Sequence, residues 1–180
     1  MEHLVTQTGN SPAAPTLVPA HTNERSGKYL IFHLAGEEFG ARILKVREII
    51  GLQDITVVPR TPSYVKGVIN LRGKVIPVID LRLKFGMPEA AYTQRTCIIV
   101  VHAQIAEDTV LMGVVVDGVS EVLSISPADI EDTPDFGGQT QTAYLLGMAK
   151  IKGKVKILLD IDQVLASQEL ILLTQERGKN

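Results

Sequence analysis

The apolar residues of this chain fall mostly in short runs rich in β-branched side chains, a pattern typical of strands rather than of long helices. The first runs are residues 29–34 and 39–42, with a turn at 35–38 between them. Residues 43–50 fit both a helical stripe and strand alternation, and we expect a single turn that leads into a strand. Further strands are expected at 68–71, 75–81, 96–102, 110–117, 119–125, 145–151 and 155–161.

Helical patterns are confined to two short segments. Pro62 follows Thr61 and is suited to the first position of a helix, which must end before Gly67. Residues 163–173 carry apolar side chains at helical spacing and predict a C-terminal helix, with a polar tail to residue 180. Residues 1–27 contain three prolines and no sustained hydrophobic period, so we expect a flexible N-terminal tail there.

The chain repeats itself, and two shifts show this. A shift of 80 residues superimposes Tyr64 on Tyr144, Gly67 on Gly147, Gly73-Lys74-Val75 on Gly153-Lys154-Val155, and Asp80 on Asp160. A shift of 73 residues superimposes Gly40 on Gly113 and residues 46–50 on 119–123. Matching glycines mark matching turns, because glycine occupies backbone conformations that other residues avoid.

The repeat predicts two copies of one all-β unit with about five short strands each. A single unit of that size has a marginal core and exposed sheet edges. Closing each sheet into a barrel would remove the edges, and packing two barrels together would enlarge the core. We therefore expect an all-β fold with short helices, built as two small five-stranded β-barrels around a shared apolar interface. The first barrel would span roughly residues 28–90 and the second 94–162. Which strand edges pair with which, and whether the barrels exchange strands, is not fixed by a repeat.

Composition narrows the possible functions. Hydrophobic residues make up 45% of the chain and aromatic residues 4%, and the net charge is only -2. Nucleic-acid binding is therefore not expected, because it needs a basic surface and stacking aromatics. No apolar run approaches the roughly 18 residues that span a bilayer, and the N-terminus lacks a signal-peptide pattern. The single cysteine, Cys97, fits a reducing compartment, and we expect a cytoplasmic protein without membrane insertion.

Catalytic and metal-binding motifs are missing from the sequence. The four histidines show no metal-ligand spacing, and nucleophile-elbow, Walker A and dinucleotide motifs are absent. His33 and His102 are interpreted as ordinary strand residues, and Cys97 as an inert thiol. Asp80 and Asp160 occupy matching places in the repeat, which favours a shared structural role such as holding a turn amide. We expect no enzymatic activity, no metal and no cofactor.

Two charged residues lie in unusual surroundings. Glu48 interrupts an apolar run, and Arg72 lies at the turn of an apolar hairpin. A bidentate ion pair between them would fix the hairpin against the segment around Val46. Two independently solvated charges are the alternative.

Several long motifs together resemble the CheW family of bacterial chemotaxis coupling proteins. They are Lys45–Ile49 (KVREI), Tyr64–Gly73 (YVKGVINLRG), Val75–Leu81 (VIPVIDL), Gly113–Val122 (GVVVDGVSEV) and Ile157–Ile161 (ILLDI). They occur in the family's order between about residues 28 and 165. The resemblance implies a CheW-like domain over residues 28–167, with two five-stranded barrels and no catalytic activity.

The resemblance also implies partners and a binding site. CheW proteins link methyl-accepting chemoreceptors to the regulatory domain of the histidine kinase CheA, in arrays at the inner face of the membrane. A similar adaptor of another chemosensory system, such as pilus-based motility, is the alternative. The receptor's helical tip is expected in the groove between the barrels. The motif positions expected to face the groove or a partner are Val46, Glu48, Ile49, Gly67, Asn70, Arg72 and Val119.

Overall fold

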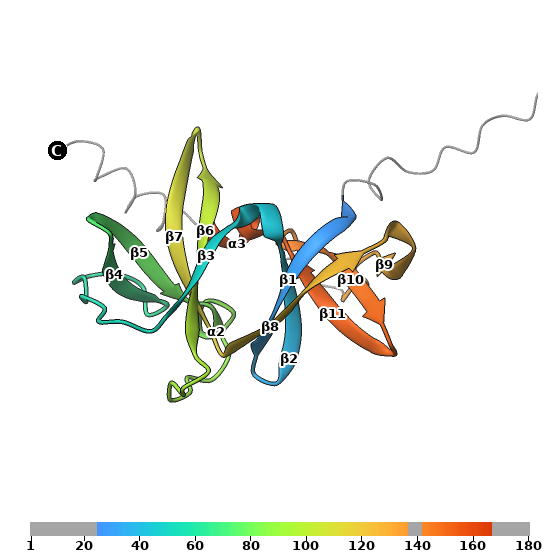
Figure 1. Ribbon diagram of the computed structural model, residues 1–180, viewed down its shortest axis with the longest axis horizontal. Helices are drawn as coiled ribbons and strands as arrows, with labels where there is room; N and C mark the ends of the chain where they lie inside the picture. The colour runs from blue at the N-terminus through green and yellow to red at the C-terminus, as the bar shows by residue number, and fades with distance from the viewer. Residues whose placement is uncertain (1–24, 137–141, 167–180) are drawn as a thin grey trace, which may run out of the picture.

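A computed structural model describes residues 25–136 and 142–166, which form two packed sheets (Figure 1). The strands are β1 (Gly27–Leu34), β2 (Glu37–Arg42), β3 (Val46–Gly51), β4 (Val65–Leu71), β5 (Lys74–Asp80), β6 (Cys97–Ile105), β7 (Asp108–Val116), β8 (Gly118–Ile125), β9 (Ile130–Glu131), β10 (Leu145–Ile151) and β11 (Lys154–Leu159). Short helical turns are η1 (Ile43–Lys45), α2 (Leu81–Lys84), η2 (Pro127–Asp129) and α3 (Ile161–Leu165). The expected mostly-β fold is confirmed.

The two sheets differ in strand number and in how their edges end. One sheet has six strands in the order β8-β1-β2-β11-β10-β9, and the other has five in the order β3-β6-β7-β5-β4. Among the described residues the two edge strands of each sheet do not pair with each other, so the predicted closing of each sheet into a five-stranded barrel is wrong in this detail. In the five-stranded sheet the edge strands are β3 and β4, and the segment after β3 reaches β4 through a bridge between Thr56 and Val68. In the six-stranded sheet the edge strands are β8 and β9, and the chain passes from β8 through η2 into β9.

The strands do not divide between the sheets as residues 28–90 and 94–162. The β1–β2 hairpin joins the sheet of β8 to β11, whereas the β6–β7 hairpin joins the sheet of β3 to β5. The two halves of the repeat therefore exchange hairpins, which answers the question that the repeat left open. Each exchanged hairpin pairs in parallel with the other half: Gly40 lies beside Leu158 and Gly113 beside Val78.

The repeat is preserved in backbone detail. The amide of Asp80 donates to the carbonyl of Tyr64 over 2.7 Å, and the amide of Asp160 donates to that of Tyr144 over 2.8 Å. Gly67 and Gly147 both have strongly positive φ angles, 141° and 157°, where each strand passes under a neighbouring segment. Sequence identity at these positions reflects similar local geometry.

Three apolar clusters hold the fold together. One cluster fills the interior of each sheet, around Tyr29 and Ile31 in the six-stranded sheet and around Ile69 and Val100 in the other. The largest cluster lies between the sheets and draws on both. The expected shared apolar interface is therefore present, and it is a filled core rather than an open groove.

Two predicted helices differ from the structure. No helix begins at Pro62: its carbonyl accepts from the Val65 amide over 3.0 Å in a single turn, since β4 already starts at Val65. The C-terminal helix begins at Ile161, two residues early, and is described only to Leu165. The remainder of that predicted helix, like most of the predicted tail of residues 1–27, lies outside the described residues.

Candidate partner-binding site

Strand β3 presents Glu48 through an irregularity in its pairing. The register with β6 shifts between Val46 and Glu48, so Arg47 is an extra residue in the ladder. Such a bulge bends a strand and redirects its side chains. Beyond it the strand alternates between half-buried and exposed positions, which leaves Ile49 45% exposed and Glu48 partly covered.

The β4–β5 turn holds Arg72 above the sheet. Arg72 and Gly73 both have positive φ, 50° and 86°, as a tight two-residue hairpin requires. The Oδ1 atom of Asn70 accepts a hydrogen bond from the Gly73 amide over 2.8 Å and so closes the turn. Asn70 thus stabilises the turn that positions Arg72, while its own position remains exposed.

Glu48 and Arg72 form the bidentate pair that the sequence analysis considered. The Nη1 atom of Arg72 lies 3.2 Å from Oε2 of Glu48, and its Nη2 atom contacts Oε1 of the same carboxylate. Because β3 and β4 are the two edges of the five-stranded sheet, the pair links these edges through side chains. The carboxylate raises the pKa of the Arg72 guanidinium through this hydrogen bond.

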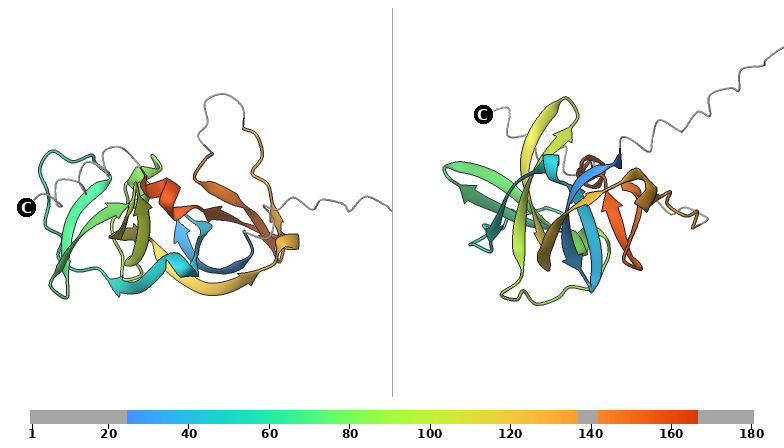
Figure 2. Two further views of the ribbon diagram at one scale, coloured as in Figure 1. Left: turned by 90° about the horizontal axis from the view of Figure 1, so that it is seen from above. Right: turned by 45° about the vertical axis from the view of Figure 1, so that its right-hand side comes forward.

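The other predicted residues divide between surface and interior. Val46 on β3 and Val119 on β8 are half-buried, and both pack against the cluster between the sheets. Strands β3 and β8 run along the same long side of the molecule (Figure 2). Val119 also lines a cleft of about 550 Å³ with His33, Arg95, Cys97, Gly118 and Ser120. Gly67 is buried beneath Thr56, so it serves the backbone rather than the exposed surface.

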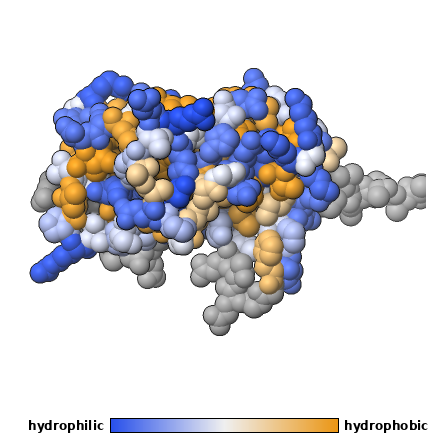
Figure 3. Space-filling view, turned by 90° about the horizontal axis from the view of Figure 1, so that it is seen from below, coloured by the Kyte–Doolittle hydropathy of each residue, from blue (hydrophilic) through white to orange (hydrophobic). Residues whose placement is uncertain are grey.

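Exposed apolar side chains at repeat-matched positions were missed by the sequence analysis. Val75 on β5 and Val155 on β11 occupy matching positions of the repeat, and each is 50% exposed. Val122 on β8 occupies the position that matches Ile49 and is 48% exposed. Apolar residues reach the surface over both ends of this face of the molecule, interspersed with polar ones (Figure 3). Each of these residues is apolar in both copies of the repeat, and an apolar residue within a strand pattern predicts burial, so the sequence contains no sign of their exposure.

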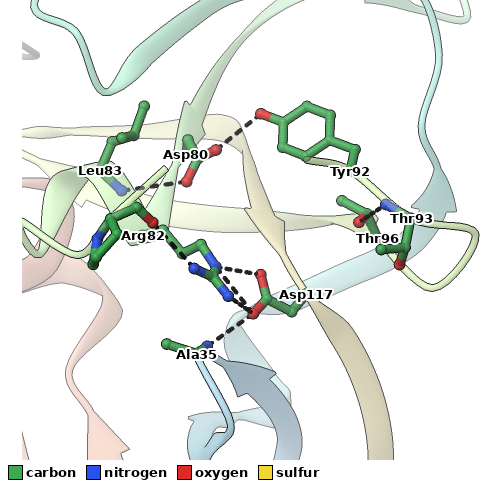
Figure 4. Close-up of polar contacts among 9 residues, drawn as sticks. Ala35, Asp80, Arg82, Leu83, Tyr92, Thr93, Thr96 and Asp117 are labelled. Atoms are coloured by element: carbon green, nitrogen blue, oxygen red, sulfur yellow. Dashed lines mark hydrogen bonds and ion pairs between the residues drawn. The ribbon is translucent and has the colours of Figure 1, made fainter. Parts of the chain in front are cut away.

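A network of polar contacts fixes the point where the chain crosses from β7 to β8 (Figure 4). Arg82 of α2 donates from Nε and Nη2 to the Asp117 carboxylate over 2.8 Å, and the Ala35 amide also donates to it over 2.8 Å. Burial tends to raise the pKa of Asp117, but these hydrogen bonds outweigh it and hold the pKa below its usual value. The network orders this crossing.

Asp80 and Asp160 have the shared structural role that was predicted. Each accepts a hydrogen bond at Oδ1 over 3.3 Å, from the Leu83 amide and the Gln163 amide respectively. Asp80 also accepts one from the Tyr92 hydroxyl over 2.9 Å, and burial together with this bond raises the pKa of Tyr92. These carboxylates cap the short helices α2 and α3.

Neither metal-binding nor membrane-spanning features occur in the part of the chain that the structure describes. Over residues 25–136 and 142–166 no three His, Cys, Asp or Glu side chains gather in a way that could hold a metal ion. Across the same ranges no helix is long and apolar enough to cross a membrane. Cys97 is half-buried, and burial raises the pKa of its thiol.

The exposed Glu48–Arg72 ion pair, with exposed Ile49 beside it, is suited to contact with another protein.

Comparison with known proteins gives the class. The family of CheW-like domains matches residues 28–169. The chemotaxis protein CheW of Klebsiella aerogenes is 41% identical over 146 residues, which cover 81% of this chain and 86% of that protein. The crystal structure of the scaffolding protein TtCheW from Thermoanaerobacter tengcongensis is similar with a TM-score of 0.69 and 35% identity, covering 80% of this chain and 95% of its own. Protein FrzA of Myxococcus xanthus is 32% identical over 126 residues, or 70% of this chain and 76% of that protein.

The chain belongs to the CheW-like family, because the match spans most of its length. The resemblance found in the sequence is thereby confirmed. Proteins of this family are scaffolds and adaptors rather than enzymes, which agrees with the expectation that this chain catalyses no reaction.

Proposed function

We propose that this protein couples chemoreceptors to the histidine kinase CheA in a chemotaxis system. The observation that supports this best is the exposed Glu48–Arg72 pair, which lies between the apolar side chains of β3 and the β4–β5 turn. A rigid ion pair beside apolar side chains gives a protein surface both orientation and contact area. An adaptor needs such surfaces and no reactive groups.

The proposed partner surface consists of Val46, Glu48, Ile49, Asn70, Arg72 and Val119, extended by Val75. Family membership supports the two partners: the regulatory domain of CheA and the cytoplasmic tip of methyl-accepting receptors. Binding to both would hold the kinase at high effective concentration near the receptor. The protein would then act at receptor arrays on the inner face of the membrane.

Titration of the full chain against the CheA regulatory domain and a receptor-tip fragment tests the proposal. We expect Arg72→Glu to weaken binding of at least one partner by about tenfold or more, because it places two carboxylates together on the surface. Lys152→Glu is the matched control, since Lys152 occupies the equivalent turn of β10 and β11 with a φ of 53°. Unchanged binding of both partners by Arg72→Glu would overturn the assignment of this surface, and failure of the unaltered protein to bind either partner would overturn the function.

A second candidate is an adaptor of a chemosensory system that does not control flagella. The similarity to FrzA of Myxococcus xanthus favours keeping it. Both candidates predict binding to a receptor and a kinase of the same types. Deletion of the gene separates them, because the first predicts loss of swimming chemotaxis and the second loss of a different behaviour.

A further inference from the structure

Three ion pairs lie where the exchanged hairpins meet the other half of the chain. Glu38 on β2 contacts Lys156 on β11. Arg82 on α2 pairs with Asp117 between β7 and β8 over 2.8 Å, and Lys45 of η1 pairs with Asp162 of α3 over 2.6 Å. Each pair joins residues from different halves of the repeat, so each exists only because the hairpins are exchanged.

The last two of these pairs are the same contact with reversed charges. The shift of 80 residues superimposes Arg82 on Asp162, one on each short helix. Their partners, Asp117 and Lys45, lie in the matching links from β7 to β8 and from β2 to β3. Helix α2 thus carries the basic residue of its pair, and the β7–β8 link carries the acidic one. Helix α3 carries the acidic residue of its pair, and the β2–β3 link carries the basic one.

Reversed charges distinguish the exchanged arrangement from its alternative. If each half kept its own hairpin, α2 would face the link that follows β2, and α3 would face the link that follows β7. Arg82 would then meet Lys45, and Asp162 would meet Asp117. Both contacts would be between like charges, which disfavour association at short range.

The third pair distinguishes the arrangements in a different way. The parallel registers are equivalent, with Leu158 beside Gly40 in one sheet and Val78 beside Gly113 in the other. Two residues earlier on each strand, the six-stranded sheet has Lys156 beside Glu38. The matching positions in the five-stranded sheet are Ile76 and Leu111, which pack together in its core.

Keeping the hairpins within each half would therefore bury charges without partners. Glu38 would face Ile76, and Lys156 would face Leu111. Lys156 is only 6% exposed in the structure, so its ammonium depends on the carboxylate of Glu38. A buried charge that loses its partner is strongly destabilising.

We infer that these three ion pairs specify the exchange of hairpins between the two halves of the chain. The hydrophobic pattern cannot do so, because the repeat makes it nearly the same in both halves. The charges at these positions do differ between the two halves. They favour the exchanged arrangement and penalise the one in which each half folds on itself.

Disulfide trapping in the full chain reports which arrangement forms. In a Cys97→Ala background, Glu37→Cys with Val155→Cys places thiols one position beyond the Glu38–Lys156 contact, where the parallel register of β2 and β11 continues. Neighbouring strand positions are close enough for a disulfide, which needs Cα atoms about 4.4–6.8 Å apart. Glu37→Cys with Val75→Cys would cross-link only if β2 paired with β5. After refolding from urea and oxidation, we expect the first pair to cross-link and the second to remain free.

Two variants should remove the preference for exchanged hairpins while keeping the apolar packing. Glu38→Leu with Lys156→Ile copies the apolar pair of the other sheet. Arg82→Asp with Asp117→Arg gives both helix contacts the same polarity, so that either arrangement has opposite charges together. We expect each variant, combined with Glu37→Cys and Val75→Cys, to increase this cross-link by about tenfold over the chain that carries the two cysteines alone.

A matched control reverses the second helix contact as well. Adding Lys45→Asp and Asp162→Lys to the Arg82→Asp, Asp117→Arg variant makes the two contacts opposite again, and the Glu37–Val75 cross-link should return to its low level. If the cross-link instead arose from a general loss of stability, it should be higher in this four-residue variant than in the two-residue variant, because four substitutions disturb the fold more than two. The inference is overturned if neither two-residue variant increases this cross-link, or if the control keeps it high. Should the helix-contact variants fail to refold, the Glu38→Leu, Lys156→Ile variant alone decides.

Discussion

At the scale of single residues, Gly67 is the glycine, among those that the structure describes, with the least room for a side chain. A Cβ atom there would lie 2.0 Å from the Thr56 carbonyl oxygen, and the φ angle is 141°. We expect Gly67→Ala to lower the free energy of unfolding by about 3 kcal/mol or more, because overpacking adds to backbone strain. Urea unfolding at neutral pH measures the change.

Gly36→Ala separates the two causes. Gly36 has a φ of 82°, and a Cβ there would have no atom within 4 Å. Only backbone strain remains, so we expect a loss of about 1 kcal/mol. Equal losses for Gly67→Ala and Gly36→Ala would show that the contact with Thr56 relaxes without cost.

The Glu38–Lys156 pair gives a residue-level prediction for pH. The hydrogen bond from Lys156 lowers the pKa of Glu38 from its ordinary value of 4.5. A lowered carboxylate pKa stabilises the fold above the unfolded pKa, and this stabilisation is lost as the pH falls through the folded pKa. Glu38→Gln should therefore cost about 2 kcal/mol at neutral pH, and the difference from the unaltered protein should shrink below the ordinary pKa.

Urea unfolding from about pH 7 to about pH 3 tests this dependence. Glu37→Gln is the control, since Glu37 is the exposed neighbour on the same strand. Its difference from the unaltered protein should stay small throughout. A cost for Glu38→Gln that does not change with pH would show that the ion pair contributes nothing beyond packing.

At the scale of elements, the two short helices rest on matched caps of unequal strength. Asp80 is 3% exposed and accepts from both the Leu83 amide and the Tyr92 hydroxyl, whereas Asp160 is less buried and caps only through the Gln163 amide. We expect Asp160→Ala to cost about 1 kcal/mol of stability and Asp80→Ala about 2 kcal/mol. Urea unfolding of both variants and of Tyr92→Phe tests the ranking, which an equal or larger cost for Asp160→Ala would contradict.

Most strands were predictable because their hydrophobic pattern and their tertiary setting agree. The turn at Ile43–Lys45 followed by β3 was anticipated from a segment that fitted both patterns. Helix α2 was missed, because the apolar run that ends in Leu81 continues the strand pattern and only the Asp80 cap breaks it. The opposite error at Pro62 has the same origin: a good local helix start lost to the pairing of β4.

The candidate site was predictable only in part. A carboxylate in an apolar run and a guanidinium at a turn are conspicuous in sequence, so Glu48 and Arg72 were singled out together. Gly67 was included through the motif, and only the structure shows that Thr56 covers it. Exposed Val75 was overlooked, because an apolar residue in a strand predicts burial unless its face is known.

At the scale of the whole molecule, sheet membership was beyond the sequence pattern. A repeat gives two halves with nearly equal hydrophobic faces, so both hairpin arrangements bury similar surfaces. The exchange also changes what the domain is, because each sheet is completed by strands from both halves. Residues 28–90 and 94–162 are therefore the two copies of the sequence repeat, and neither range contains all the strands of one sheet.

Cutting the chain between the halves tests this consequence directly. Fragments 25–92 and 93–166 should each be unfolded alone, since each lacks the hairpin that its strands pair with and a core of about 70 residues is marginal even when complete. An equimolar mixture should recover the exchanged sheets, because the missing hairpin of each fragment is supplied by the other. Amide hydrogen exchange measures this as protection that appears on mixing and is absent from either fragment. Protection in a fragment alone would mean that one half can pair with its own hairpin, and the mixture serves as the control that the cut itself is tolerated.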